Sequence, residues 1–408
     1  MSKPLLKLNQ RVFVPVAILV AIAYAVATAS ASDWRMFRGS DSSGVAADAE
    51  IPTSWNLETG ENIAWSVKMP GRGVCGPIIV GGKVIATSSA GNDNKQLHIW
   101  CMDDASGTVL WKRNFLATGR SQCHELTSMA APTPASDGEL IFAFFSSNDL
   151  ICLDLEGSIR WMRGLALEHA NAFDDRGMAA SPVVTGDAVI VQVECQGDSF
   201  AAGFDKHSGQ RLWQIPLTTT TSWNSPAVLT GTNGKELVLL QSTKQVMAID
   251  PQTGESQWTF DGRSSQIPSA TVSGDIAFVP SGGLVAMRNG EVLWQENRLG
   301  PQSASPVAND GKVYVIRRTV LACGNAETGE VLWQERLKGQ QFWASPVIAG
   351  TKLFVVDLGG IGQVIDVSSK KAEVLSENEF GEEVLGTPAI SGNALYVRGV
   401  THLWKIAN

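Results

Sequence analysis

The sequence repeats one pattern about every 40 residues, and this repeat most constrains the fold. The clearest copy runs from Ser305 to Trp333. It opens on Ser-Pro, continues with short apolar runs separated by turn residues such as Asp310-Gly311, and closes on Val-Leu-Trp. Short β-rich runs bounded by Gly, Asn or Asp are typical of antiparallel strands joined by tight hairpins. Each copy therefore predicts one small antiparallel sheet of four strands.

Eight copies of this pattern follow one another along the chain. A single copy cannot bury both faces of its sheet, so the copies must stack on one another. A four-stranded repeat of this length is typical of a propeller blade. We therefore predict an all-β, eight-bladed β-propeller. The copies open at Gly76-Pro77, Thr133-Pro134, Ser181-Pro182, Ser225-Pro226, Ser269-Ala270, Ser305-Pro306, Ser345-Pro346 and Thr387-Pro388.

Most copies close on a tryptophan, and the chain has 13 Trp against only three Tyr. An indole at the same place in successive blades can lie against the sheet of a neighbouring blade, where it buries about 150–250 Å². In the seventh copy we expect Val374-Leu375 to take the place of the tryptophan. The predicted docking residues are Trp65, Trp111, Trp161, Trp213, Trp258, Trp294 and Trp333.

The two ends of the repeat region complement each other. Residues 62–67 match a closing strand with no blade before it, whereas the last copy, Thr387 to Ile406, lacks its closing strand. We therefore expect the N-terminal strand to complete the last blade, which removes the free sheet edges. Residues 32–60 are predicted to be an irregular lead-in that packs on the outside of the propeller.

The first 31 residues have the composition of a Sec-type signal peptide. Basic residues (Lys3, Lys7 and Arg11) precede an apolar run, and Ala29-Ser30-Ala31 predicts cleavage before Ser32. An uncleaved anchor is the alternative, although the apolar run is short for a membrane span. We expect a periplasmic or secreted protein, consisting of residues 32–408, without a transmembrane domain after cleavage.

Charge and cysteine content restrict the partners. The formal net charge is −8 and no basic run occurs, which argues against nucleic acid as a partner because phosphates require clustered Lys and Arg.

An exported chain with six Cys can form disulfides, whose pairing the sequence does not define. Alternatively, Cys101, Cys152 and Cys323, which occupy equivalent runs of three copies, are small buried thiols. We expect a monomer.

The repeat resembles that of the pyrroloquinoline-quinone (PQQ) propeller superfamily. The resemblance rests on the pattern Ser-Pro…Asp-x-x-Thr-Gly-x-x-Leu-Trp, as in residues 248–254 and 330–333, and covers about Ile63 to Ile406. One branch of this superfamily consists of longer dehydrogenases that hold PQQ and calcium, often beside two adjacent cysteines, which this chain lacks. Another branch is the propeller subunit of the outer-membrane assembly machinery, which has no cofactor. Its lipid-accepting cysteine is also missing here.

In such propellers the loops before each opening dipeptide converge on the mouth of a central funnel. Polar groups together with aromatic faces would suit a carbohydrate, a peptide or a planar cofactor. Alternatively, these residues merely solvate the funnel. The candidate ligand-binding residues are Arg72, His124, Glu125, Asp175, Arg176, Trp223, Asn224, Gln302, Phe342 and Trp343, with Gln266 and Glu383 at equivalent places.

No catalytic or metal-binding residue is assigned. His124 and Glu125 could form an acid–base pair, but neighbours in an extended segment point to opposite faces. The favoured function is a non-catalytic binding or scaffold protein similar to the outer-membrane assembly propeller, with an envelope protein or a glycan as its partner and without a cofactor. The alternatives are a PQQ- and calcium-dependent oxidoreductase and a polysaccharide-binding module.

Overall fold

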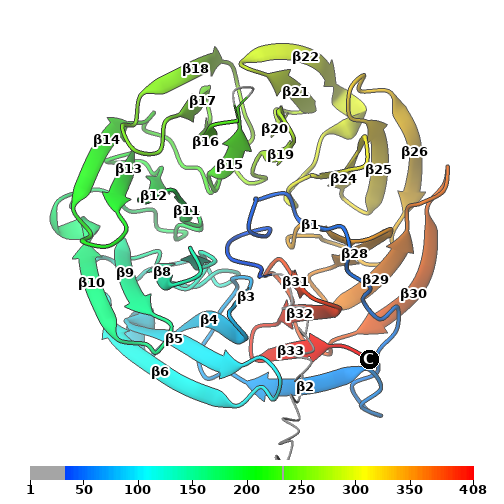
Figure 1. Cartoon of the computed structure of the whole chain (residues 1–408), viewed down its shortest axis with the longest axis horizontal. Coiled ribbons are helices and arrows are strands. Elements are labelled where there is room, and N and C mark those ends of the chain that lie inside the picture. Colours follow the sequence, from blue (N-terminus) through cyan, green and yellow to red (C-terminus); the bar gives the residue numbers. More distant parts are fainter. Residues whose placement is uncertain (1–32, 232–233) are drawn as a thin grey trace, which may run out of the picture. The chain divides into compact units, whose positions relative to one another are not determined.

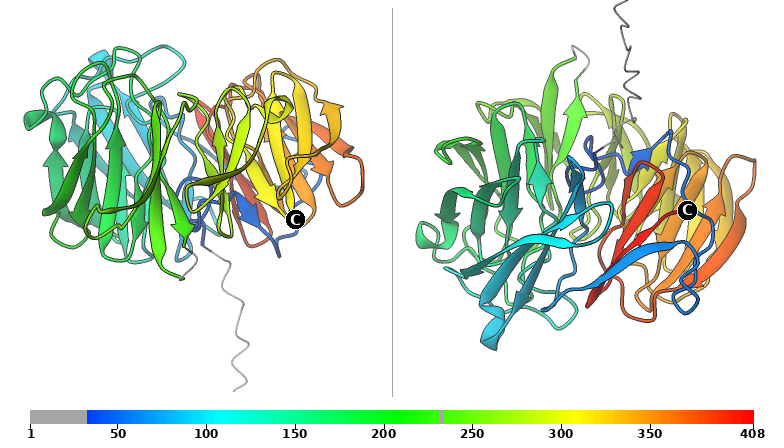
Figure 2. Two further views of the ribbon diagram at one scale, coloured as in Figure 1. Left: turned by 90° about the horizontal axis from the view of Figure 1, so that it is seen from above. Right: turned by 60° about the horizontal axis from the view of Figure 1, so that its bottom comes forward.

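The computed structural model describes residues 33–231 and 234–408, which form an eight-bladed β-propeller (Figure 1). Each blade is built on four antiparallel strands that run in order from the central axis to the periphery. Figure 2 shows the blades from the side, standing next to one another around the axis. The predicted fold class is confirmed.

In blades 1 to 4 the innermost strand comes first in the chain. Blade 1 comprises β3 (Ile78–Val80), β4 (Lys83–Ala90), β5 (Gln96–Asp103) and β6 (Val109–Leu116). Blade 2 comprises β7 (Ala135–Ser136), β8 (Leu140–Phe144), β9 (Asp149–Asp154) and β10 (Ile159–Gly164). Blade 3 comprises β11 (Val183–Thr185), β12 (Ala188–Val193), β13 (Phe200–Asp205) and β14 (Arg211–Pro216). Blade 4 comprises β15 (Ala227–Thr230), β16 (Glu236–Ser242), β17 (Gln245–Ile249) and β18 (Ser256–Asp261).

Blades 5 to 7 repeat this order, and blade 8 combines both ends of the propeller. Blade 5 comprises β19 (Thr271–Ser273), β20 (Ile276–Pro280), β21 (Leu284–Arg288) and β22 (Glu291–Glu296). Blade 6 comprises β23 (Val307–Asn309), β24 (Lys312–Arg317), β25 (Val320–Asn325) and β26 (Val331–Arg336). Blade 7 comprises β27 (Val347–Ala349), β28 (Lys352–Val356), β29 (Ile361–Asp366), β30 (Glu373–Glu379) and the added β1 (Val45–Ala46). Blade 8 comprises β31 (Ala389–Ser391), β32 (Ala394–Arg398), β33 (His402–Ile406) and β2 (Ile63–Lys68). Three short 3-10 turns are η1 (Asn92–Asn94), η2 (Leu165–Leu167) and η3 (Asn297–Leu299).

The N-terminal strand closes the ring as predicted. Strand β2 pairs antiparallel with β33, so that Trp65 lies opposite Lys405 and Lys68 lies opposite His402. Because the outer strand of blade 8 comes from the start of the propeller, the sheet hydrogen bonds of this blade hold the two ends of the ring together.

The hydrophobic core lies between neighbouring blades. Inner strands are buried on both faces, as in β9, where every residue is buried, whereas outer strands such as β10 are partly exposed. In four blades an aromatic residue of the second strand contacts the tryptophan of the fourth strand. One example is Phe142 and Trp161, whose ring centroids are 6.0 Å apart. The core clusters also join residues of neighbouring blades, such as Ile85 of blade 1 and Ile141 of blade 2, so the core forms layers between the blades around the axis.

Five of the seven repeat tryptophans donate a hydrogen bond to the next blade. The indole Nε1 of Trp213, for example, lies 2.8 Å from the carbonyl oxygen of Pro251 in the turn between β17 and β18. Below this indole, Gly254 has φ +72°, and a Cβ added there would lie 2.7 Å from the ring. Trp65, Trp111, Trp161 and Trp294 make the equivalent bond at 2.9 Å, whereas the buried Nε1 groups of Trp258 and Trp333 have no partner among the described residues.

Blade 7 differs from the expectation in both residue and partner. Ser376, rather than Val374-Leu375, occupies the tryptophan position, because it lies opposite Val364 just as Trp333 lies opposite Cys323. A tryptophan from the lead-in packs on this blade instead. Trp55 contacts the rings of Phe354 and Phe380 at centroid distances of 5.7 and 5.3 Å.

The prediction that the lead-in packs on the outside of the propeller holds for Thr53 and Trp55, which bond to the outer strand β30, but is wrong for residues 34–46. Trp34 pairs with Ile79 in β3, the carbonyl oxygen of Arg35 accepts from Ser136 in β7, and β1 pairs in parallel with β27. Ser42 accepts from Val228 in β15. The lead-in thus contacts the innermost strands of blades on opposite sides of the ring, as its central position in Figure 1 shows. The reason is that these strands expose backbone groups toward the channel, and the lead-in supplies their partners.

The six cysteines are all unpaired, so the structure favours buried thiols over disulfides. Cys101, Cys152 and Cys323 lie at equivalent places in the third strands, and burial raises the pKa of each thiol to about 12. The predicted signal peptide and its cleavage site lie outside the described residues. In residues 33–231 and 234–408, no helix has the length and apolarity needed to cross a membrane.

Candidate functional site

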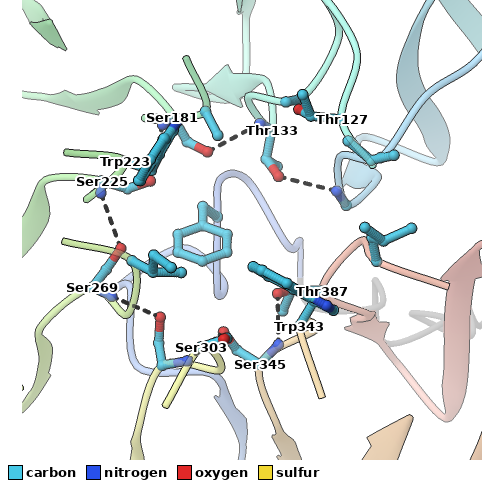
Figure 3. Close-up of a pocket in the computed structure, with 18 of the residues that line it drawn as sticks. Thr127, Thr133, Ser181, Trp223, Ser225, Ser269, Ser303, Trp343, Ser345 and Thr387 are labelled. Carbon is cyan, nitrogen blue, oxygen red and sulfur yellow. Dashed lines mark hydrogen bonds between the residues drawn. The ribbon is translucent and has the colours of Figure 1, made fainter. Parts of the chain in front are cut away.

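The opening residues of the blades form a ring of hydroxyl groups around the channel (Figure 3). The side-chain oxygen of each opener accepts a hydrogen bond from the backbone N–H of the opener one blade earlier, at 2.9 to 3.1 Å. Each blade is therefore tied to the next at the channel wall. The seven acceptors are Thr133, Ser181, Ser225, Ser269, Ser305, Ser345 and Thr387.

The ring of hydroxyls is interrupted between blades 8 and 1. Gly76 stands where the other blades have Ser or Thr, and a Cβ at this position would lie 2.4 Å from the carbonyl oxygen of Thr387. Backbone of the first and last blades therefore approaches too closely for any side chain. The glycine is required by this close approach rather than by a turn.

A cavity of about 380 Å³ occupies the mouth of the channel. Its lining includes the side chain two residues before each opener, because alternate residues of an extended segment face the same side. These eight residues supply most of the apolar wall. They are Val74, Ala131, Ala179, Trp223, Ile267, Ser303, Trp343 and Leu385.

The lead-in supplies the floor of the cavity. Its Phe37 is part of the lining, together with the ring of openers. The lead-in binds the inner strands at positions such as Ile79 and Ile348, three residues past the openers and thus farther from the mouth. The cavity is consequently open on the loop side and bounded by the lead-in on the other, and we call it the cup.

Four of the predicted site residues meet in the cup: His124, Arg176, Trp223 and Trp343. Trp223 is held by its indole Nε1, which lies 2.7 Å from the carbonyl oxygen of Gly177. The Nε1 of Trp343 is buried and has no hydrogen-bond partner in the structure. Figure 3 shows the two indoles on opposite sides of the cavity. Two aromatic surfaces thus face one apolar space.

The rim of the cup carries the two basic side chains. The Nδ1 atom of His124 accepts a hydrogen bond from the backbone N–H of Leu126 at 3.1 Å. The backbone N–H of His124 lies 3.1 Å from the carbonyl oxygen of Arg176, which joins the two loops. Glu125 is exposed and does not line the cup, so the structure does not bring it to His124 as an acid–base pair.

Arg72 supports the rim from behind. Its Nε donates to the carbonyl oxygen of Thr127 at 3.1 Å, and its Nη2 lies 3.4 Å from the Glu383 carboxylate. Since Thr127 lines the cup, Arg72 holds a wall residue rather than facing the cavity itself.

Other predicted residues lie elsewhere. Asn224 is buried and donates to the carbonyl oxygen of Pro268, and Phe342 is buried in the core beside blade 7. Asp175 is exposed and does not line the cup. Gln302 and Gln266 line a separate polar pocket between blades 4 and 5. Asn224, Gln302 and Phe342 stand one or three residues before an opener and therefore face away from the channel.

Phe37, Ile267 and Leu385 are lining residues that the sequence analysis missed. The last two could have been found, because every residue two positions before an opener lines the cup. No local pattern pointed to Phe37, since the lead-in lies outside the repeat. Only the folded ring brings that residue to the axis.

The cup does not fit a PQQ–calcium pair. Its lining contains no Asp or Glu, whereas calcium is held mainly by carboxylate and carbonyl oxygens. Within the described ranges, no group of three or more His, Cys, Asp or Glu residues is placed to hold a metal ion. The donors present are indoles, hydroxyls, an imidazole and a guanidinium.

An eight-bladed propeller built from this repeat defines a member of the PQQ-like propellers. The chain belongs to the family described as outer membrane protein assembly factor BamB, whose sequence profile matches residues 37–259, 204–316 and 317–407. The outer membrane protein assembly factor BamB of Burkholderia pseudomallei (strain K96243) is 24% identical over 278 residues, which are 54% of this chain and 72% of that protein.

Solved structures share the fold at lower identity. BamB from Moraxella catarrhalis superposes with a TM-score of 0.61 at 19% identity, over 84% of this chain and 96% of its own. A europium-containing methanol dehydrogenase superposes with a TM-score of 0.67 at 15% identity, over 91% of this chain and 90% of its own. At these identities the similarity establishes the propeller architecture and not the activity.

Proposed function

We propose that this protein is a non-catalytic scaffold of the bacterial cell envelope that binds a partner protein at the cup. The observation that carries the proposal is an apolar cavity with two facing indoles, a basic rim and no carboxylate in its lining. Family membership adds support, because the related proteins are named as outer-membrane assembly factors. The predicted signal peptide agrees with an envelope location.

The cup suits an apolar side chain presented by a folded or extended partner. Burying one aromatic side chain between Trp223 and Trp343 removes about 150–250 Å² of its surface from water. Aromatic anchors that fill a pocket of this kind commonly dominate the energy of protein interfaces. The rim residues His124 and Arg176 can then bond to polar groups around the anchor.

The test is site-specific photo-crosslinking in the cell envelope. A photoreactive phenylalanine analogue replaces Trp343 in the cup, and in a matched control it replaces Leu332, which is 43% exposed on the outer strand β26. We expect one envelope protein to crosslink from Trp343 and not from Leu332. The crosslink to the same partner should disappear when Trp223→Ala is combined with the photoreactive analogue at position 343.

Two other results would overturn the proposal. Saturable quenching of tryptophan fluorescence by PQQ with calcium would support an oxidoreductase instead. A saturable fluorescence change with envelope oligosaccharides, without any protein crosslink from the cup, would support the polysaccharide-binding alternative. We expect neither titration to saturate with the folded protein.

A further inference from the structure

Beneath the cup, the lead-in carries a buried positive charge that the binding function does not use. The side chain of Arg38 is 1% exposed, and only one of its three nitrogens is bonded: Nη2 donates to the carbonyl oxygen of Ala270 at 2.5 Å. Its Nε and Nη1 are buried without a hydrogen-bond partner in the part of the chain that the structure describes. A buried charge is strongly unfavourable unless it is paired and hydrogen-bonded.

No protein carboxylate compensates this guanidinium. Arg38 forms no ion pair with any residue in the ranges 33–231 and 234–408. Asp41 is the acidic residue that influences it most, but Asp41 is exposed and bonded to the backbone N–H and hydroxyl of Ser43. Burial lowers the pKa of Arg38 to about 9, so the side chain still carries its charge at neutral pH.

The position of Arg38 is enforced by the lead-in backbone. Arg38 has φ +64°, a conformation that L-residues rarely adopt, and its carbonyl oxygen accepts from Gly44 at 2.7 Å. Its guanidinium carbon lies 5.0 Å from the ring centroid of Phe37, the floor of the cup. A strained residue that is held in place by its surroundings often marks a functional position.

A second buried donor without a partner lies next to the same backbone contact. Thr271 directly follows Ala270, is wholly buried, and its hydroxyl has no hydrogen-bond partner. The guanidinium nitrogens and this hydroxyl can all donate. A group that accepts several hydrogen bonds and carries a negative charge would satisfy the two unbonded guanidinium nitrogens of Arg38.

We propose that Arg38 binds a small inorganic anion, with chloride as the physiological species, between the lead-in and blade 5. The anion neutralises the buried guanidinium and anchors the floor of the cup to the inner strand β19. This anion site is separate from the mouth of the cup, so the proposal does not depend on whether a partner protein binds there.

The experiment compares thermal unfolding in sodium chloride and in sodium gluconate at equal ionic strength. Gluconate is too large for a closed site, so chloride should raise the Tm of the wild-type protein by about 2 °C for each tenfold increase above its Kd. The Arg38→Met variant should lose this difference. Arg35→Met is the matched control, because Arg35 lies on the same lead-in but already pairs with Asp33 at 2.8 Å, and it should keep the chloride effect.

The proposal is overturned if wild-type protein has the same Tm in both salts, or if Arg38→Met retains the chloride effect. If Arg38→Met does not fold, the anion site is tested instead by anomalous diffraction from wild-type crystals grown in bromide. An anomalous peak within hydrogen-bond distance of the Arg38 guanidinium supports the anion site. Water molecules alone at that position would contradict it.

Discussion

At the scale of single residues, the most unusual carboxyl group belongs to Glu194, just after β12. It is 2% exposed and accepts hydrogen bonds from Ser242 and from Gln192, the latter at 3.1 Å. Burial dominates these bonds and raises the pKa of Glu194 to about 7. The native protein therefore holds this proton up to a higher pH than the unfolded chain does.

The pH dependence of stability follows from this raised pKa. A raised carboxyl pKa means that stability is complete below the unfolded pKa of about 4.5 and decreases as the pH rises through 7. The loss is at most about 3.5 kcal/mol, because a tenfold change in proton affinity corresponds to roughly 1.4 kcal/mol. We expect Glu194→Gln to match wild type at pH 4.5 and to be more stable at pH 8, as measured by urea unfolding. The variant of the exposed Glu125, Glu125→Gln, should not diverge from wild type in this way. If the stability of Glu194→Gln ran parallel to that of wild type across this pH range, Glu194 would not be the group responsible.

Gly76 tests the close approach of blades 8 and 1. A Gly76→Ser change would supply the missing eighth hydroxyl, yet its Cβ would collide with the carbonyl oxygen of Thr387. We expect a destabilisation of about 1–3 kcal/mol, the usual cost of extra atoms that force a packed backbone to shift. Ser345→Thr is the control, since Thr133 and Thr387 already fill equivalent positions. Calorimetry should show a lower Tm for Gly76→Ser alone.

At the scale of elements, the fourth strand of every blade except blade 7 packs on the neighbouring blade through one indole. Trp213 in β14 is 9% exposed and combines ring burial with a hydrogen bond to Pro251. Trp258 in β18 is partly buried, and its Nε1 has no partner. The repeat predicted the same contact for both residues, but the outcome depends on the turn of the next blade. The turn of blade 5 that lies against Trp258 is the shorter hairpin between β21 and β22, which contains Gly290.

This difference predicts unequal costs for the same substitution. Trp213→Ala should lose about 3–5 kcal/mol of unfolding free energy, as for large buried aromatic residues. Trp258→Ala should lose less, because no hydrogen bond is broken. Urea midpoints at fixed pH provide the comparison. Equal losses would mean that ring burial alone accounts for the docking.

At the scale of the whole molecule, stability depends on closure of the ring through β2 and β33. A chain that ends at Arg398 lacks β33, so β2 loses its partner and blade 8 keeps only two strands. We expect this truncation to aggregate or to lose cooperative unfolding, because an open propeller exposes two unpaired edges. A chain shortened only by Asn408 should behave like wild type in size-exclusion chromatography and thermal melts.

Local signals in the chain were sufficient to predict the blades, their number and the closure of the ring. Alternating apolar runs, turn residues and tryptophans recur at a regular spacing, and no distant contact is needed to recognise them. Of the eight residues two positions before an opener, which share one face, the sequence analysis identified Trp223 and Trp343.

The remaining features became apparent only in the folded ring. The lead-in lies outside the repeat, so no periodic signal indicated that Phe37 would close the cup or that Arg38 would be buried below it. The pairing of Ser376 with Val364, the close contact at Gly76 and the raised pKa of Glu194 likewise arise from neighbours distant in the chain. Packing and burial of this kind are properties of the assembled ring, because each depends on which backbone and side chains the other blades bring to the same place.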